Sequence, residues 1–121
     1  IGKPAASFPH AAMYYSNATD AGAAILEVQD NRLDLKWICE DGIIRDHFTM
    51  MKNVNKTFDI HLSKGQSATL MASFVDNKYK WNKSENTARS ITVTPPRGKT
   101  TYVVQDEFNC LKDVFKVEVA K

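Results

Sequence analysis

The sequence has few of the residues that build chemical sites: its 121 residues include three histidines, two cysteines and five glycines. No apolar run approaches the ~20 residues that a membrane-spanning helix needs, so we expect no membrane insertion. The sixteen basic and fourteen acidic residues are scattered, and no basic stripe indicates a nucleic-acid partner. The hydrophobic content of 43% suits an ordinary soluble globular chain.

Patterns typical of metal sites and nucleophiles are also missing. His10, His47 and His61 stand alone, without the short His or Glu spacings of zinc sites. Cys39 and Cys110 form no Cys-x-x-Cys motif, so they are either one disulfide or two separate thiols, and we favour separate thiols. We therefore predict no catalytic, metal-binding or cofactor-binding residue, and no cofactor, in this chain.

The paired and single carboxylates fall in predicted turns, where aspartate is favoured because its side chain bonds to the nearby backbone. No Asp-x-Asp-x-Asp array indicates a calcium loop. We interpret the following acids as turn residues: Glu40-Asp41, Asp76, Asp106-Glu107 and Asp113.

Alternation of apolar and polar residues with a period of two recurs along nearly the whole chain, which predicts an all-β fold. The first three runs are separated by Asp30-Asn31 and Asp41-Gly42, two dipeptides that suit tight hairpin turns. A three-stranded antiparallel meander is expected from the runs 23–29, 32–39 and 43–51. One face of its middle strand should be buried, and because both faces carry apolar residues, the sheet should be covered on two sides or rest against something larger.

A polar stretch, Lys52 to Lys56, marks a boundary between an N-terminal segment, 1–55, and a β-sandwich, 56–121. Six further strands with turn residues between them are expected at 57–62, 67–75, 78–82, 90–94, 100–105 and 114–120. Their inward side chains should be Phe58, Ile60, Leu62, Ala68, Leu70, Ala72, Phe74, Tyr79, Trp81, Ile91, Val93, Tyr102, Val104, Phe115, Val117 and Val119.

Residues 57–121 resemble a bacterial immunoglobulin-like, or polycystic-kidney-disease-type, repeat of the kind attached to secreted Bacteroidetes proteins. The matching segments are Gly65-x-x-Ala68-Thr-Leu70, Tyr79-Lys-Trp81-Asn82, Ser90-Ile-Thr-Val-Thr-Pro95, Thr100-Thr-Tyr102-x-Val104 and Asp106-x-x-Asn109-Cys110. The resemblance implies an immunoglobulin-like β-sandwich, in which Tyr102 resembles the corner tyrosine whose hydroxyl bonds to the backbone.

Residues 4–54 resemble the C-terminal segment of purple-acid-phosphatase-type metallophosphoesterases. The matching segments are Phe8 to Tyr15, Gly22-x-x-x-Leu26-Glu-Val28, Asn31-x-Leu33-x-Leu35-x-Trp37 and Asp41-Gly42-x-Ile44-x-Asp46-x-Phe48. The family's dimetal motifs, such as Gly-Asn-His and Gly-His-x-His, are missing. The resemblance therefore implies a non-catalytic C-terminal region that packs against, or spaces, the catalytic domain of the same parent chain. It also implies a secreted or cell-surface protein with a signal peptide upstream.

The alternative function is an immunoglobulin-like module that binds carbohydrate or a cell-surface partner. Sandwich domains often bind ligands through the loops at their ends. The loops to consider are 83–89 and 106–112.

Overall fold

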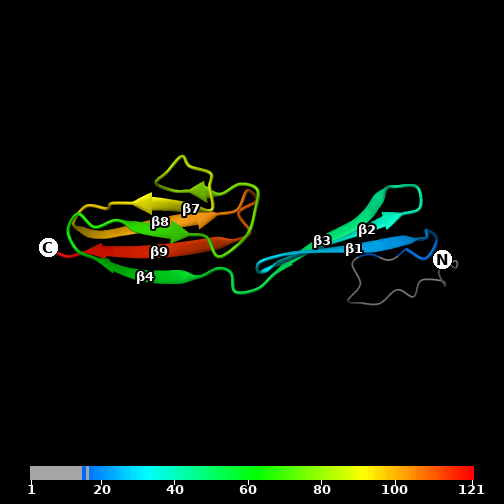
Figure 1. Cartoon of the computed structure of the whole chain (residues 1–121), viewed down its shortest axis with the longest axis horizontal. Coiled ribbons are helices and arrows are strands. Elements are labelled where there is room, and N and C mark those ends of the chain that lie inside the picture. Colours follow the sequence, from blue (N-terminus) through cyan, green and yellow to red (C-terminus); the bar gives the residue numbers. More distant parts are fainter. Residues whose placement is uncertain (1–14, 16) are drawn as a thin grey trace. The chain divides into compact units, whose positions relative to one another are not determined.

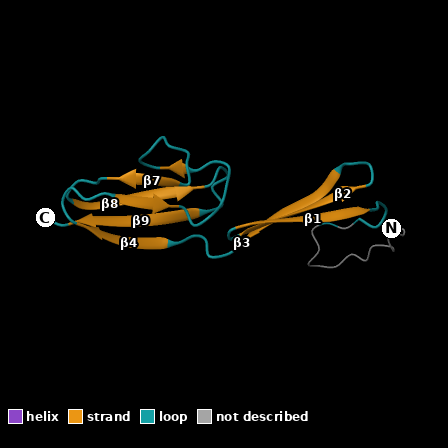
Figure 2. Ribbon diagram, in the orientation of Figure 1, coloured by secondary structure: helices purple, strands orange, loops and turns teal. Residues whose placement is uncertain are grey.

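The computed structural model describes Tyr15 and residues 17–121, and every regular element in that part of the chain is a β-strand (Figures 1 and 2). This confirms the all-β class. The chain divides into two compact units, Ile1–Met50 and Met51–Lys121. The composition shift predicts a boundary slightly later, after residue 55. His10 and most of the segment 8–15 lie outside the described residues.

The N-terminal unit contains the predicted meander, a three-stranded sheet in the order β1-β2-β3. Its strands β1 and β2 pair antiparallel, from Gly22 opposite Cys39 to Gln29 opposite Arg32. Asp30 and Gly42 adopt φ angles of 54° and 82° in the two turns, so one residue of each dipeptide takes the positive φ that the turn chemistry predicts. The second turn is a three-residue loop, closed by hydrogen bonds from Cys39 N to Ile43 O and from Gly42 N to Cys39 O. The strand bounds are β1 (Gly22–Gln29), β2 (Arg32–Cys39) and β3 (Ile44–Met51).

Gly22 lets the Trp37 indole lie close to the backbone of β1. A Cβ atom at this position would collide with the Ile38 carbonyl oxygen and would lie 2.8 Å from Trp37 Nε1. On the same indole, the Tyr15 ring packs edge-on with the ring centroids 6.2 Å apart. A larger residue at position 22 would therefore displace either the strand or the indole.

The C-terminal unit consists of a four-stranded sheet, ordered β4-β9-β8-β6, and a two-stranded sheet, β5-β7. β4 runs parallel to β9, whereas the other pairs are antiparallel. Figure 1 shows β4, β9 and β8 side by side. The strand bounds are β4 (Thr57–Leu62), β5 (Ala68–Met71), β6 (Lys80–Trp81), β7 (Ser90–Val93), β8 (Gly98–Gln105) and β9 (Lys112–Val119).

The core of the C-terminal unit lies between its two sheets. Leu70 and Ile91 enter it from the smaller sheet, and Val104 and Phe115 from the larger one. Phe115 stacks on Phe58, with ring centroids 4.9 Å apart. Every inward side chain that the alternation predicts is either buried in this cluster or packed against it. The alternation missed Val75, Leu111, Met51 and Val54, which are buried or packed against the cluster from loops and from the end of β3.

The tyrosine hydroxyl that bonds to the backbone belongs to Tyr79. It donates a hydrogen bond to the Phe74 carbonyl oxygen (3.2 Å) and accepts one from the Asp76 amide (2.8 Å). The resemblance implies this role for Tyr102, but Tyr102 lies inside β8, away from a corner, and its ring is part of the core. Tyr79 precedes a short strand directly after the 72–78 loop, so its hydroxyl can reach back to that loop.

The carboxylate of Asp113 ties three segments of the C-terminal unit together. It accepts hydrogen bonds from the Lys56 amide (2.8 Å), the Ser73 amide (2.6 Å) and the Ser73 hydroxyl (2.7 Å). The interpretation of Asp113 as a turn residue is wrong, because β9 already begins at Lys112 and Asp113 is fully buried. Asp106 does act as a turn residue, since its carboxylate accepts a bond from the Leu111 amide (2.8 Å).

Candidate functional site

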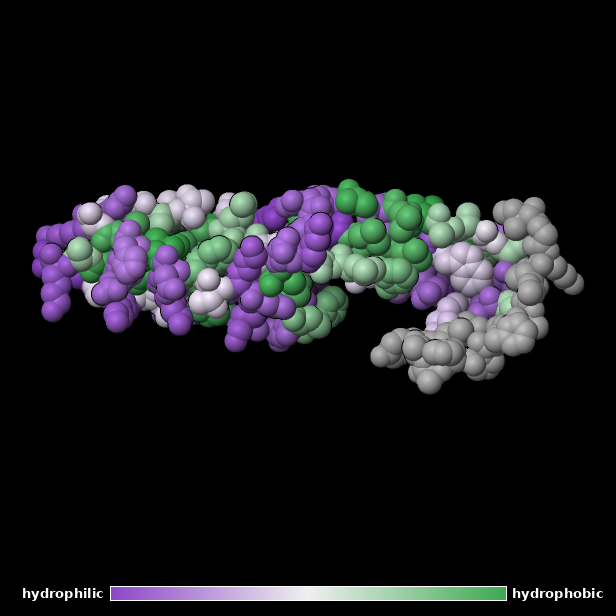
Figure 3. Space-filling model, turned by 90° about the horizontal axis from the view of Figure 1, so that it is seen from below, coloured by the Kyte–Doolittle hydropathy of each residue, from purple (hydrophilic) through white to green (hydrophobic). Residues whose placement is uncertain are grey.

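One face of the meander is apolar, and several of its large side chains are exposed. The Thr49 hydroxyl bonds to Asp34, so these two residues share a face. Alternation places the residues next to them, Phe48 and Met50 on β3 and Leu33 and Leu35 on β2, on the other face. Leu26, Val28 and Met50 remain 61%, 71% and 60% exposed. Figure 3 shows hydrophobic side chains gathered on this unit. The apolar face consists of Ala24, Leu26, Val28, Leu33, Leu35, Trp37, Phe48 and Met50, and at the Cys39 end of this face the Arg45 guanidinium hydrogen-bonds to the Cys39 side chain.

The expectation of a buried central-strand face is only partly met within the described residues. Leu33, Leu35 and Trp37 on β2 are half-buried, because the side chains of both neighbouring strands flank them. Among the described residues of this unit, Cys39 is the one apolar side chain that is buried. Among the described residues of this unit no second layer packs on the sheet to exclude water, so the outer strands leave large side chains in solvent.

The opposite face, which we call the charged face, carries ion pairs. Arg32 bonds to Asp34 at 2.8 Å, and Lys36 lies 3.7 Å from Glu27. The hydrogen bonds from Arg32 and then from Thr49 lower the pKa of the Asp34 carboxyl below its usual value. Ile25 and Ile38 interrupt this face at a shallow hollow of about 520 Å³. The two faces therefore differ in chemistry, with apolar residues dominating one of them.

The β2–β3 turn is fixed by an arginine–carboxylate fork. The Arg45 guanidinium donates to both oxygens of Asp41, at 2.8 and 2.6 Å, and lies 3.4 Å from Asp20. These bonds, with a further one from the Ile43 amide, lower the pKa of Asp41 to about 2. A bidentate pair of this kind orients the hairpin and holds the register of β3.

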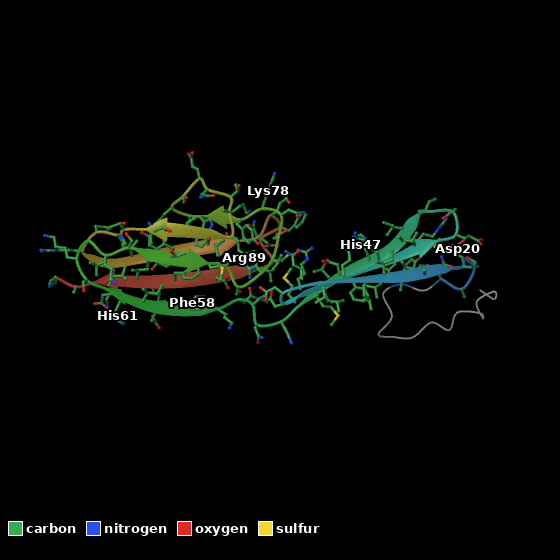
Figure 4. All side chains as sticks on the ribbon, viewed as in Figure 1. Asp20, His47, Phe58, His61, Lys78 and Arg89 are labelled. Carbon is green, nitrogen blue, oxygen red and sulfur yellow. The ribbon has the colours of Figure 1, made fainter. Side chains whose placement is uncertain are left out.

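The histidines and cysteines are spread over both units. His47 lies on β3, and His61 on β4 has an exposed side chain 3.8 Å from Glu118 (Figure 4). His61 and Glu118 border a shallow groove of about 170 Å³ on the outer side of the larger sheet. Cys39 is buried and Cys110 is exposed, and both are free thiols. Among the described residues, no three His, Cys, Asp or Glu side chains come together in a group that could hold a metal ion.

The two loops that the sequence suggests for ligand binding differ in what they present. In the loop 83–89, the Ala88 carbonyl oxygen accepts a bond from the Trp81 indole, and Asn86 and Ser84 bond to loop amides. In the loop 106–111, the side chain of Phe108 is 77% exposed. That loop is held by Asp106 and by a bond from Lys80 to Asn109, which adopts a φ of 58°. Only the second loop holds a large apolar side chain out in water.

No family model matches the chain, and no curated protein matches it significantly. Within the part of the chain that the structure describes, no helix is long and apolar enough to cross a bilayer.

Proposed function

We propose that this chain is a non-catalytic accessory region of a secreted purple-acid-phosphatase-like metallophosphoesterase. Its meander docks through the apolar face onto the catalytic domain of the same parent chain. Residues 56–121 form an immunoglobulin-like module that spaces this assembly from other parts of the protein. The observation that carries the proposal is the uncovered apolar face, opposite a face rich in ion pairs. The sequence resemblance of residues 4–54 supports the identity of the partner.

The size of the apolar face suits a contact within one polypeptide. Strands of eight residues at about 3.3 Å per residue and about 4.8 Å apart give a face of ~26 by ~14 Å. Covering it buries about 750 Å² summed over both surfaces, below the ~1,200 Å² of stable free complexes but within the ~600–1,500 Å² of interfaces between domains of one chain. A covalently linked partner needs less contact area because its effective concentration is high.

The proposal places the chemistry outside this chain. The two metal ions of such phosphatases would be held by the catalytic domain, and residues 1–121 would supply neither metal ligand nor cofactor. The N-terminal unit supplies exposed apolar surface, and the C-terminal unit supplies a hydrophobic core of its own.

The experiment begins with the coding sequence upstream of Ile1, which should encode Gly-Asn-His and Gly-His-x-His motifs. In the full polypeptide, Leu26→Asp should then accelerate hydrogen exchange across the meander, because a carboxylate on the apolar face opposes docking. Glu27→Asp, at the next position on the charged face, is the matched control and should change nothing. The proposal fails if the motifs are missing, or if the 121-residue chain alone hydrolyses p-nitrophenyl phosphate with added iron, zinc or manganese.

A second candidate function, carbohydrate or cell-surface binding, is favoured by the exposed Phe108 on its fixed loop. An aromatic side chain on a rigid loop can stack on an apolar sugar face or enter a partner's pocket. Saturable glycan-array binding that Phe108→Ala removes would support this function. Binding that is unchanged by Phe108→Ala would refute the assignment to this loop.

A further inference from the structure

The C-terminal unit carries most of the positive charge of the chain. Residues 51–121 contain twelve basic and seven acidic residues, which gives a formal net charge of +5, whereas residues 1–50 contain four basic and seven acidic ones. Two of the seven acids in the C-terminal unit, Asp106 and Asp113, are buried, and their carboxylates accept bonds from backbone amides. The exposed charge of this unit is therefore biased towards cations, and such a surface attracts anionic ligands.

Three of these cations are lysines on the outer face of the larger sheet. The residues of β9 alternate between buried and more exposed positions, and Lys112 and Lys116 are exposed. Lys99 on β8 is also exposed and lies opposite Glu118, while Thr101 lies opposite Lys116. In the described part of the chain, no ion pair joins Lys99, Lys112 or Lys116 to another residue. These ammonium groups are therefore available to an anion from outside.

A shallow groove of about 170 Å³ lies in this outer face. Acids border it beside the lysines: Asp59 on β4 lies opposite Lys116, and the Glu118 carboxylate lies 3.8 Å from His61, which Figure 4 labels. The groove thus places hydrogen-bond acceptors next to cationic donors. Its outward polar side chains are Lys99, Lys116, Asp59, Glu118, Thr101 and His61.

A ligand that fits this groove carries both an anionic group and hydroxyl groups. Ammonium groups pair with carboxylate or sulfate oxygens, whereas carboxylates accept hydrogen bonds from hydroxyls. A nucleic acid matches the groove poorly, because its phosphates would meet two carboxylates and no groove residue is aromatic and able to stack on a base. A membrane also matches it poorly, since no exposed apolar side chain borders the groove and could enter a bilayer. An acidic sugar has both of the required groups.

We propose that this groove binds one unit of an acidic glycan, a sugar ring that bears a carboxylate or a sulfate. Lys99 and Lys116 bind the anionic group, while Asp59 and Glu118 accept hydrogen bonds from the ring hydroxyls. Lys112, on the same strand as Lys116, extends the positive charge by about 13 Å along the sheet, towards a further acidic unit of a longer glycan. The site is distinct from the Phe108 loop and independent of docking by the meander, so it goes beyond the function proposed above.

Isothermal titration calorimetry of the 121-residue chain tests the proposal. The probes are an oligogalacturonate, which bears carboxylates only, a carrageenan oligosaccharide, which bears sulfates only, neutral maltohexaose, and an oligothymidylate of similar charge. We expect saturable binding to one or both acidic glycans and none to maltohexaose. The double variant Lys99→Gln/Lys116→Gln should weaken glycan binding at least about 10-fold. Lys83→Gln, which removes the same charge from an exposed loop position, is the matched control and should leave binding unchanged.

The variant Asp59→Asn separates a sugar site from general attraction between a basic surface and a polyanion. It removes a negative charge, so non-specific binding of a polyanion should become tighter. A groove that uses the carboxylate as a hydroxyl acceptor should instead bind the acidic glycan about 3-fold or more weakly, because a neutral amide is a poorer acceptor.

Several results would overturn the proposal. These are tighter glycan binding in Asp59→Asn, equally tight binding of the oligothymidylate, and no binding of either acidic glycan. Glycan binding that survives Lys99→Gln/Lys116→Gln but is lost with Phe108→Ala would assign the site to the Phe108 loop instead. Co-sedimentation with phosphatidylserine vesicles, without glycan binding, would identify an anionic membrane as the ligand and likewise overturn it. None of these results affects the docking proposal, which is tested by hydrogen exchange in the full polypeptide.

Discussion

The replacement Asp113→Ala should severely destabilise the C-terminal unit. The variant removes the acceptor of three hydrogen bonds and leaves the Lys56 and Ser73 amides without their bonds to the carboxylate. A hydrogen bond to a charged group contributes about 1.5–3 kcal/mol, so losing the two amide bonds to the carboxylate should cost ~3–4 kcal/mol. A unit of this size has a total stability of only ~4–10 kcal/mol, and the loss corresponds to a fall in Tm of ~12–30 °C.

Urea unfolding of the whole chain measures this loss. A Trp37→Phe background leaves Trp81, which is buried beside Phe115 in the core, as the one fluorescent tryptophan of the chain. Asp59→Ala, which removes an exposed carboxylate from β4, is the matched control and should change the free energy of unfolding by less than about 0.5 kcal/mol.

A double variant tests whether Ser73 and Asp113 stabilise the unit through the same hydrogen bonds. Ser73→Ala removes one of the three donors to Asp113 and should cost about 1 kcal/mol in the wild-type background. In the Asp113→Ala background the same change should cost less, because its acceptor is already gone. A loss of under ~1 kcal/mol for Asp113→Ala, or full additivity of the two variants, would refute the reasoning that the hydrogen bonds to this carboxylate stabilise the unit.

Three further predictions test other parts of the chain. The hydrogen bonds from Arg45 lower the pKa of Asp41 from 3.8 to about 2. Their stabilisation of the β2–β3 turn should therefore be fully present above pH 3.8 and be lost as the pH falls through about 2. NMR titration of the Asp41 carboxyl measures its pKa, and the same pKa in the Arg45→Gln variant would contradict the prediction. Cys110 should react rapidly with Ellman's reagent in the native chain, whereas buried Cys39 should react only after unfolding; two equally fast thiols would show that Cys39 is accessible. Phe74→Ala, at a fully buried core position, should lower the free energy of unfolding in urea by about 3–5 kcal/mol. Phe108→Ala, at a side chain that is 77% exposed, should lower it by under ~0.5 kcal/mol. Similar losses for both variants would contradict the burial difference.

The alternation of side chains predicted the strands and the core because a period of two reports directly on which face of a strand is buried. Phe58, Leu70 and Val117 follow that rule and lie where it places them. Val75, which is buried, and Leu111, which is partly buried against the core, were not predicted because they belong to irregular segments without a period. The burial of Asp113 was not predicted from the alternation, because its carboxylate accepts hydrogen bonds from Lys56 and Ser73, which are distant in sequence.

The candidate docking face was only half predictable. The apolar pattern of Leu33, Leu35 and Trp37 is visible in the sequence, and so is the opposing alternation in β3. The exposure of this face cannot be predicted from the sequence, because a strand with one apolar face has the same alternation whether that face is covered or exposed.

The parallel pairing of β4 with β9 also determines how the C-terminal unit bears tension. The chain enters this pair at Thr57, opposite Val114, and leaves it at Val119, opposite Leu62, so entry and exit lie at opposite ends of two parallel strands. A pull on the two ends of the unit acts along these strands and loads their ladder bonds together in shear, instead of opening them one after another. A module between an enzyme domain and a point of attachment would thereby resist mechanical extension, with the first and last strands of its own fold as the clamp.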